Sequence, residues 1–413
     1  MEGSMDFEQK YTDDQERFRK DVQDWLKTNI PEELKEPVDR RADFNEDLVK
    51  LWRAASKKLG AKGWLHPTSP KQYGGGGLSA AHDTIIHEEF NRHRIPRRED
   101  GLIIANLLVW GTEQQKQKFL VPLLKGEKTS WQKSTEPHSG SDLASYESTA
   151  VQDGDDWVLN GSNVFISGRG IPDFLWGPML TDKSAPRHRN LGFFIIPCPS
   201  DGLTITTMPL INGNEQHFIY LDNVRISGDH LIGGDHQGWQ VANTGLELEH
   251  GGQGAAFPSD SVVETLVDYM RGQKRVGQTP AGDPVLQEET VQAYIEAHLH
   301  GLFLKRTYDM YQKRVVVGWE GGCGALYGRH YGLRNAGRVR DVMGMGAMLG
   351  PKDPLAPLEG LQEVEQRNSL QHMHGAGSLN IAKVTLARRI GISRTKERPA
   401  PTPATAGRLS GDT

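Results

Sequence analysis

The sequence predicts a mixed α+β chain in which a helical segment, a β-rich segment and a second helical segment follow one another. Apolar residues recur at helical spacing within residues 1–125, for example at Val22 and Trp25. Short β-rich runs separated by turns occupy residues 126–235, and helical periodicity returns over residues 236–395. These three patterns predict an N-terminal helical domain, a small central β-barrel or sandwich, and a C-terminal helical bundle.

Composition limits the classes of protein and of partner. A chain of 413 residues can form two or three domains with a large core, and its net charge of −5 gives no reason to expect nucleic acid or an anionic membrane as a partner. Only Cys198 and Cys323 are present, so neither a disulfide framework nor a zinc site is expected, and a cytoplasmic location follows. The longest apolar stretch, residues 102–110, contains Asn106 and is too short to span a membrane.

The N-terminal segment contains two patterns that invite a functional interpretation. His87 and His93 are six residues apart rather than four, so a helical zinc motif is excluded, and we expect His87, Glu88 and Glu89 to lie on a solvated helix face. The glycine run at residues 74–77 follows no apolar strand, which favours a loop over a dinucleotide-binding fingerprint.

The central segment contains five runs with strand character. An Asn-Gly pair, Asn160 and Gly161, separates the first two runs and predicts a hairpin turn between them. Residues 183–189 are expected to form an exposed polar loop. The predicted strands are Trp157–Leu159, Asn163–Ser167, Leu191–Ile196, Leu203–Thr207 and His217–Leu221.

The C-terminal segment predicts long helices over Val262–Arg271, Val285–Arg314 and Ser369–Ile392. Glycines cluster after residue 318 and again after residue 344, but neither cluster follows a strand. We therefore expect turns that join helices rather than a nucleotide-binding loop. The tail over residues 396–413 is rich in Pro, Ala and Thr and is expected to be disordered.

The segment Trp131–Asp142, WQKSTEPHSGSD, is the strongest candidate for a binding site. Its hydroxyls, small residues and backbone N–H groups can line one face of a flat, phosphate-bearing ligand. The same residue types also form ordinary turns, so the segment by itself leaves both interpretations open.

A second motif, WVLNGSNVFIS at residues 157–167, follows about fifteen residues further on. Together, TEPxSGSD and this motif resemble the acyl-CoA dehydrogenase family, whose usual forms are TEPxAGSD and YVLNGxKxWIT. The two motifs match in content, order and spacing, and the resemblance extends over nearly the whole chain. It implies a helical domain, a β domain and a C-terminal four-helix bundle, assembled as a dimer of dimers that is homomeric or mixed.

The resemblance also implies a reaction and a cofactor. Members of the family remove hydrogen from the α and β carbons of an acyl-CoA thioester: a carboxylate takes the α-proton, and the β-hydride passes to FAD. The thioester carbonyl must be polarised by hydrogen bonds because the α-proton is weakly acidic. Electron-transfer flavoprotein is the implied electron acceptor.

Residues in both motifs and near the C-terminus are implied as ligand contacts. Thr135 is expected at the flavin ring, and Ser141 near the pyrophosphate or the acyl-CoA. Phe165 stands where the family usually has Trp, and an ordinary alternating strand is the alternative for Phe165 and Ser167. The implied FAD contacts are Gln132, Ser134, Thr135, Gly140, Ser141, Phe165, Ser167 and Ser378.

The catalytic base is not at the usual position. Ala376, within HGAGSLNIAK, occupies the place of the usual Glu, although its backbone N–H can still bond the thioester carbonyl. Some members that act on branched or bulky acyl groups carry the base on an earlier helix, and LELEH at residues 246–250 places Glu249 there. Glu247 is about 200° away around a helix, so it cannot face the same pocket. The alternative is that Glu249 is a solvated or ion-paired carboxylate.

Together with the missing base at Ala376, two departures from the family pattern keep other functions open. Gln273 replaces an Arg that often reaches the flavin diphosphate of a neighbouring subunit, and Asp341 replaces a flavin-contacting Gln. One alternative is a non-catalytic partner subunit of a mixed oligomer. Another is a flavin-dependent monooxygenase or oxidase in which His372 or His374 replaces the base. No third metal ligand accompanies these two histidines.

Overall fold

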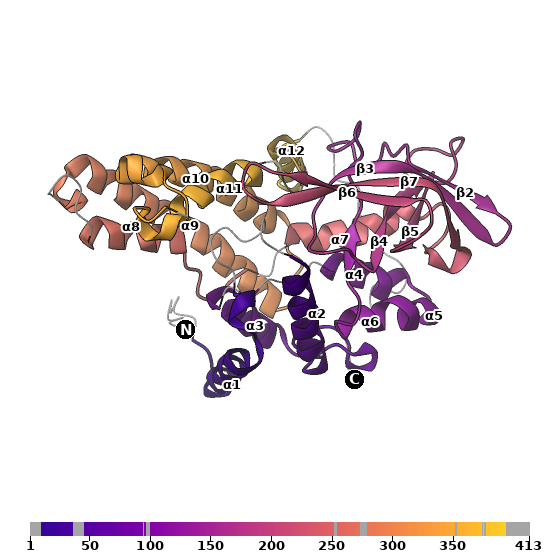
Figure 1. Ribbon diagram of the computed structural model, residues 1–413, viewed down its shortest axis with the longest axis horizontal. Coiled ribbons are helices and arrows are strands. Elements are labelled where there is room, and N and C mark those ends of the chain that lie inside the picture. The colour runs from indigo at the N-terminus through magenta and orange to yellow at the C-terminus, as the bar shows by residue number, and fades with distance from the viewer. Residues whose placement is uncertain are drawn as a thin grey trace. The chain divides into compact units, whose positions relative to one another are not determined.

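The structure, a computed structural model, describes residues 10–35, 45–93, 95, 100–251, 254–272, 279–351, 353–373, 375 and 377–393 (Figure 1). Within these ranges, one compact unit holds the residues up to Asp21 and from His250 onward, and the other holds those from Val22 to Glu249. No described helix combines the length and the apolar character that crossing a membrane requires.

Helices occupy the N-terminal part of the chain, as the periodicity predicts. α2 begins where the Asn45 side chain accepts hydrogen bonds from the N–H groups of Asp47 and Leu48, and α5 begins with a capping box between Thr112 and Gln115. The elements are α1 (Asp13–Asn29), η1 (Glu32–Leu34), α2 (Glu46–Ala61), η3 (Lys71–Tyr73), α3 (Ala80–Arg92), α4 (Gly101–Trp110), α5 (Glu113–Gln115), η4 (Lys116–Leu120) and α6 (Val121–Leu124).

The prediction of a fully solvated face on α3 is wrong at one position. Glu89 is buried, and its carboxylate oxygens lie 3.6 Å from Arg92 and 3.8 Å from His93. A buried carboxylate is tolerated here because the cationic guanidinium of Arg92, on the next turn of the chain, offsets its desolvation.

One eight-stranded sheet forms the centre of the second unit. Its order is β6-β7-β3-β2-β4-β5-β8, and β1 pairs with β4 in parallel. The strands are β1 (Ser130–Gln132), β2 (Thr149–Asp153), β3 (Asp156–Ile166), β4 (Phe174–Leu180), β5 (Leu191–Pro197), β6 (Leu203–Pro209), β7 (Glu215–Ser227) and β8 (Leu231–Ile232), with η5 (Gly228–His230) between the last two.

The hairpin turn predicted at Asn160 and Gly161 is wrong, because β3 runs straight through this pair. The register of β3 against β7 shifts there, and Gly161 has φ +145°. A Cβ at Gly161 would come within 2.1 Å of the Ser148 hydroxyl. The glycine thus serves a β-bulge, and the turn between β2 and β3 falls at Gly154, where φ is +64°.

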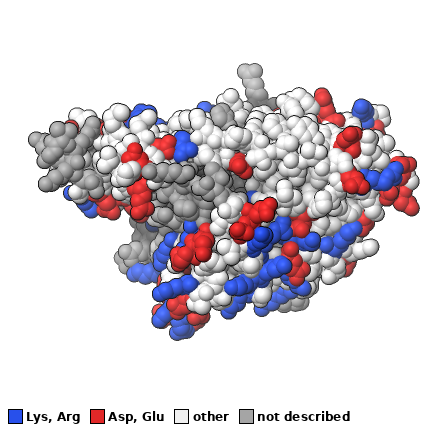
Figure 2. Space-filling view, in the orientation of Figure 1, with Lys and Arg blue, Asp and Glu red and all other residues white. Residues whose placement is uncertain are grey.

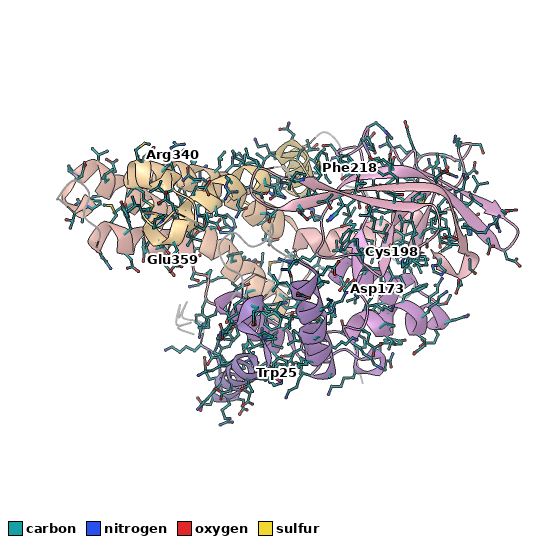
Figure 3. All side chains as sticks on the ribbon, in the orientation of Figure 1. Trp25, Asp173, Cys198, Phe218, Arg340 and Glu359 are labelled. Atoms are coloured by element: carbon teal, nitrogen blue, oxygen red, sulfur yellow. The ribbon has the colours of Figure 1, made fainter. Side chains whose placement is uncertain are left out.

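Helices pack on the sheet through an apolar core. Side chains of α4, η4 and α6 meet β4, β5 and the start of α7 (Gly238–Gly251), including Leu107, Phe119, Phe193 and Val241. Arg53 of α2 is held by Asp173, which is labelled in Figure 3, at 2.8 Å, and Asp173 also accepts from Lys128. Burial opposes the charge of Asp173, but these hydrogen bonds and that of the Thr129 N–H lower its pKa.

The other unit is helical. Its elements are α8 (Ser261–Gly272), η6 (Pro280–Gly282), α9 (Pro284–Gln312), α10 (Trp319–Met343), η7 (Gly344–Met348), η8 (Pro357–Gly360), α11 (Leu361–His372) and α12 (Leu379–Arg389). Glu296 of α9 forms ion pairs with Arg334 and Arg338 of α10, at 2.9 and 3.0 Å. α9 and α10 are therefore joined by charge as well as by packing.

Two predictions about this unit are wrong. The glycines from residue 321 to residue 328 lie inside α10 rather than in turns. Two of them let α9 approach: a Cβ at Gly324 would lie 3.0 Å from Phe303, and one at Gly328 would lie 2.7 Å from the His300 ring. The helix predicted over residues 369–392 is divided between α11 and α12. Gly377, with φ +88°, lies between the two helices.

Candidate active site

Residues 135–142, which we name the TEP turn, leave β1 in a tight loop. The N–H groups of Glu136 and Ser139 each bond the other residue's carbonyl, at 2.9 and 3.1 Å. The Glu136 carboxylate is buried and accepts the N–H groups of Glu147 and Ser148, at 2.7 and 3.0 Å. Glu136 thus holds the loop together and does not face a ligand.

A second set of bonds brings the two sequence motifs together. The Thr135 carbonyl accepts the Val164 N–H at 2.9 Å and the Asn163 side-chain amide at 3.3 Å. A Cβ at Gly168 would lie 2.0 Å from the Trp131 ring, so only glycine lets the end of the second motif pack against the first. The structure therefore places the TEP turn beside the end of β3.

Phe165 does not follow the alternation of an ordinary strand. Its φ is +60°, it lies where the register of β3 shifts between Asn163 and Ile166, and its side chain is 56% exposed. A bulge with a left-handed non-glycine residue redirects a side chain, and such features concentrate at binding sites. The ordinary-strand alternative is therefore wrong for Phe165.

The surface near Phe165 carries hydroxyls and aromatic rings. Ser167 accepts a hydrogen bond from the Gln216 amide of β7 at 3.1 Å. On the same strand, Phe218 (labelled in Figure 3) stacks on Tyr220 with ring centroids 6.2 Å apart. Figure 2 shows that the surface over β6 and β7 is mostly white, so few charged side chains gather there.

The end of the TEP turn is exposed, and its charge is balanced. The Asp142 carboxylate pairs with Arg187, from the exposed loop between β4 and β5, and accepts the Ser145 hydroxyl at 2.6 Å. The hydrogen bond from Arg187 is the main cause that lowers the pKa of Asp142. Gly140 and Ser141 are exposed beside this ion pair, so the Asp142 charge does not stand alone next to them.

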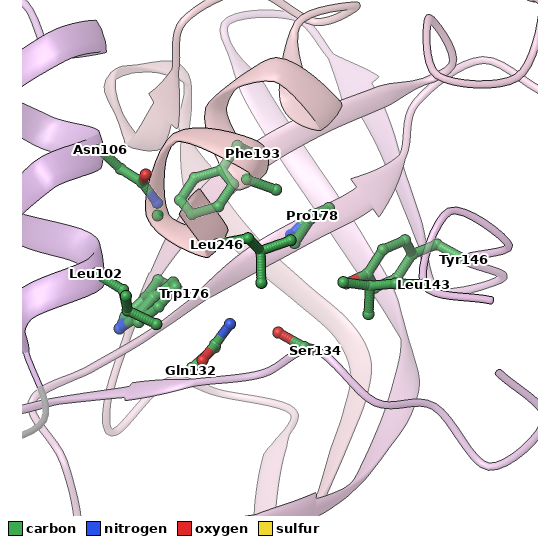
Figure 4. A pocket seen from close by; sticks show the side chains of 12 residues that line it. Leu102, Asn106, Gln132, Ser134, Leu143, Tyr146, Trp176, Pro178, Phe193 and Leu246 are labelled. Carbon is green, nitrogen blue, oxygen red and sulfur yellow. The ribbon is translucent and has the colours of Figure 1, made fainter. Parts of the chain in front are cut away.

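A small pocket, which we name the acyl pocket after the group that the family resemblance implies, lies within the second unit (Figure 4). Gln132 and Ser134 line it, whereas Lys133 between them is fully buried on the other side of the chain. Its apolar lining residues are Leu102, Leu143, Trp176, Pro178, Phe193 and Leu246. The pocket is therefore mainly apolar, with polar groups along β1.

Helix α7 forms one wall of the acyl pocket through Ala242, Gly245 and Leu246. The Trp110 ring N–H donates to the Thr244 hydroxyl at 2.9 Å and fixes α4 against α7. Position 249 lies on α7 one turn beyond Gly245, and the side chains of Glu247 and Glu249 are outside the described residues.

Sequence reasoning missed two polar residues of the acyl pocket, Asn106 of α4 and Tyr146. Both are buried, and burial raises the pKa of Tyr146. The one signal for Asn106 was its place as a polar residue within the longest apolar run of the chain. Tyr146 follows the TEP turn with no motif to mark it.

The remaining predicted contacts belong to the helical unit or lie outside the described residues. Ser378 belongs to the helical unit, where its side chain caps α12 by accepting the Ile381 N–H at 3.4 Å. Asp341 is exposed beside Arg340, at 3.4 Å. Ala376, Gln273 and His374, together with the His372 side chain, lie outside the described residues. Over the described ranges, no cluster of three His, Cys, Asp or Glu residues is placed to hold a metal ion.

Comparison with known proteins identifies the family. The model of the acyl-CoA dehydrogenase N-terminal domain matches residues 12–127, and that of the middle domain matches residues 132–224. The acyl-CoA dehydrogenase IpdE1 of Mycobacterium tuberculosis is 31% identical over 313 residues, which cover 72% of this chain and 77% of that protein.

The chain belongs to the acyl-CoA dehydrogenase family.

Other similar proteins match a larger share of this chain. FadE26 of Mycobacterium tuberculosis is 24% identical over 90% of this chain and 95% of its own. Among solved structures, the Tcur3481-Tcur3483 steroid ACAD has a TM-score of 0.80 at 23% identity and covers 95% of this chain and 100% of its own. The ChsE4-ChsE5 complex from Mycobacterium tuberculosis has a TM-score of 0.81 at 23% identity, over 94% and 99%. These structures confirm the fold, and the family membership makes the dehydrogenase a flavoprotein oxidoreductase of lipid catabolism that acts on acyl-CoA.

Proposed function

We propose that the dehydrogenase acts on an acyl-CoA with a branched, cyclic or otherwise bulky acyl group, with Glu249 as the base that removes the α-proton. The observation that carries this proposal is the acyl pocket against α7. Ala242, Gly245 and Leu246 line it, and residues three, four and seven positions apart share one face of a helix. Position 249 is seven residues from 242 and four from 245, so helical spacing assigns it to the face that lines the pocket.

Each wall of the acyl pocket has a role in this chemistry. Trp176 and Phe193 are buried aromatic residues that exclude water around the acyl group, which strengthens electrostatic interactions with the thioester. The Glu249 carboxylate accepts the α-proton. FAD, when bound, supplies the acceptor for the β-hydride.

The residues at the end of β3 suit a flavin. Phe165 presents an exposed aromatic face, Ser167 offers a hydroxyl, and the Thr135 carbonyl accepts the N–H of Val164, the residue before Phe165. The ion pair of Asp142 with Arg187 offsets a carboxylate that would otherwise repel a diphosphate. Thr135, Phe165 and Ser167 would hold the ring, with Gln132 and Ser134 of β1 beside them, and Gly140 and Ser141 would approach the phosphates.

An anaerobic titration with a panel of acyl-CoAs tests the base, with the visible flavin band as the signal. Glu249→Gln should keep FAD bound but slow bleaching by about 10²–10⁴-fold, because the amide cannot accept the α-proton. Glu247→Gln is the matched control and should bleach at the wild-type rate. Wild-type bleaching in Glu249→Gln would remove Glu249 from the mechanism.

A second candidate is a partner subunit of a mixed oligomer. Two of the solved structures similar to this chain each pair two proteins by name, Tcur3481-Tcur3483 and ChsE4-ChsE5. The residues at positions 273 and 376 also depart from the family pattern. This candidate predicts a purified chain without a flavin band, whereas the first predicts bleaching and electron delivery to electron-transfer flavoprotein.

A further inference from the structure

The acyl pocket contains a buried amide whose hydrogen-bonding capacity is not used by the described part of the chain. Asn106 is 0% exposed, and neither its Oδ1 nor its Nδ2 has a hydrogen-bond partner there. Leaving such a group unpaired costs about 1–3 kcal/mol, and nearly all buried polar groups in folded proteins are bonded. An apolar side chain of similar size at this position would avoid the cost, so the amide calls for an explanation other than stability.

The neighbouring helix approaches this amide, which lines the acyl pocket, through a glycine. Gly245 of α7 faces it, and a Cβ at that position would lie 3.1 Å from Oδ1 and 3.3 Å from Nδ2 of Asn106. Any larger residue at 245 would cover the amide. The hydrogen bond from Trp110 to Thr244, the residue before Gly245, holds α4 and α7 at this separation.

The polar groups of the acyl pocket stand among apolar walls. In Figure 4, Asn106 and Tyr146 lie on different sides of the pocket, with Leu246 between them. The Tyr146 hydroxyl lies close to Ser134, but the two groups do not reach hydrogen-bonding geometry. The surroundings of Asn106 therefore suit a mainly apolar group that carries a localised polar substituent.

We propose that the acyl group bound in this pocket carries a hydroxyl substituent, which Asn106 recognises. A hydroxyl both donates and accepts, so it can donate to Oδ1 and accept from Nδ2. A carbonyl substituent would leave Oδ1 unpaired, and a hydrocarbon would leave both atoms unpaired. Asn106 is thus a specificity-determining residue, and this inference rests on the proposed assignment of the pocket to the acyl group.

Binding of a matched series of acyl-CoAs to the FAD-loaded protein tests this inference. The series is cyclohexylpropanoyl-CoA and its ring-hydroxylated positional isomers, with affinity measured by calorimetry and turnover followed separately by flavin bleaching. At least one hydroxylated isomer should bind about 10²-fold more tightly than the unsubstituted compound, because a site built to bond a hydroxyl discriminates against its absence. Equal or weaker binding of every hydroxylated isomer would overturn the inference.

Variants separate Asn106 from the rest of the pocket. Asn106→Leu should remove the preference for the hydroxylated isomer while keeping or strengthening binding of the unsubstituted compound. Thr207→Val, at an exposed threonine of β6 outside the pocket, should leave the preference unchanged. A preference that survives in Asn106→Leu would rule out Asn106 as its source.

The two readouts keep this inference distinct from the proposed function. Hydroxyl-selective binding without bleaching by any compound would support Asn106 but refute dehydrogenation of this acyl class. Bleaching without hydroxyl selectivity would support the proposed function and refute the role of Asn106. If no compound of the series binds, both are refuted for this acyl class.

Discussion

Two buried polar sites lie in the same unit of the molecule and are built in opposite ways. In the TEP turn, Glu136 is 2% exposed, and its carboxylate accepts two backbone N–H groups. In the acyl pocket, Asn106 is 0% exposed, and its amide has no partner within the described chain. The first side chain completes the fold, whereas the second keeps its hydrogen-bonding groups for a ligand. Burial alone therefore does not distinguish a structural polar residue from a functional one. The distinction lies in whether the side chain has hydrogen-bond partners within the protein.

Glu136→Gln should give the largest change in stability. A glutamine has one oxygen for the two N–H groups of Glu147 and Ser148, and its own N–H₂ would face one of these donors. The free energy of unfolding should fall by about 3 kcal/mol, since bonds to a charged acceptor are involved. Chemical denaturation of the two proteins measures this.

The exposed Glu127→Gln is the control for charge removal and should change stability by less than about 0.5 kcal/mol. If Glu136→Gln is as stable as the wild type, the TEP turn does not depend on its buried carboxylate, and the contrast with Asn106 disappears.

Lys133 offers an intermediate case between the two sites, and Lys133→Met should stabilise the protein at pH 7. The amine is fully buried, and its hydrogen bond to the Pro178 carbonyl is long, at 3.4 Å. Burial lowers the pKa of Lys133 from 10.5 to about 8. Removing the buried charge should raise the free energy of unfolding by roughly 1–3 kcal/mol.

This gain should depend on pH with a defined sign. Below about pH 8 the Lys133 amine is charged in both the folded and the unfolded protein, so the full cost of burying the charge is present. As the pH rises from about 8 to 10.5, the amine loses its proton in the folded protein first, so this cost declines. The advantage of Lys133→Met should therefore shrink over that window in denaturation curves. The exposed Lys57→Met should show no such trend. A destabilised Lys133→Met at pH 7 would mean that attraction to Glu136 outweighs the cost of burial.

Asn106→Leu should give the smallest change in the free energy of unfolding, and this change should have the opposite sign to that of Glu136→Gln. No hydrogen bond within the described chain is lost, and an unpaired amide is replaced by an apolar group of similar size. Thermal unfolding in the absence of substrate should show stabilisation of about 1 kcal/mol or less. A loss above about 2 kcal/mol would indicate that Asn106 has a structural role after all.

The order of helical and β-rich segments could be predicted from the sequence because periodicity is a local property of the chain. The two motifs could be matched to a family because their residues are contiguous. Local signals failed where packing overrides them: the Asn160–Gly161 pair forms a bulge because β3 pairs with both β2 and β7, and the glycines of α10 stay helical because α9 lies against them.

By itself, the sequence determined the family, the TEP turn and the helix that carries Glu249. Only the tertiary structure decided which polar residues share a pocket. Asn106, Tyr146 and Gly245 come from segments far apart in the chain, and no pattern in the sequence links them. Hydrogen bonds of side chains depend on which segments meet, so the unpaired amide of Asn106 could be recognised only after the chain was folded.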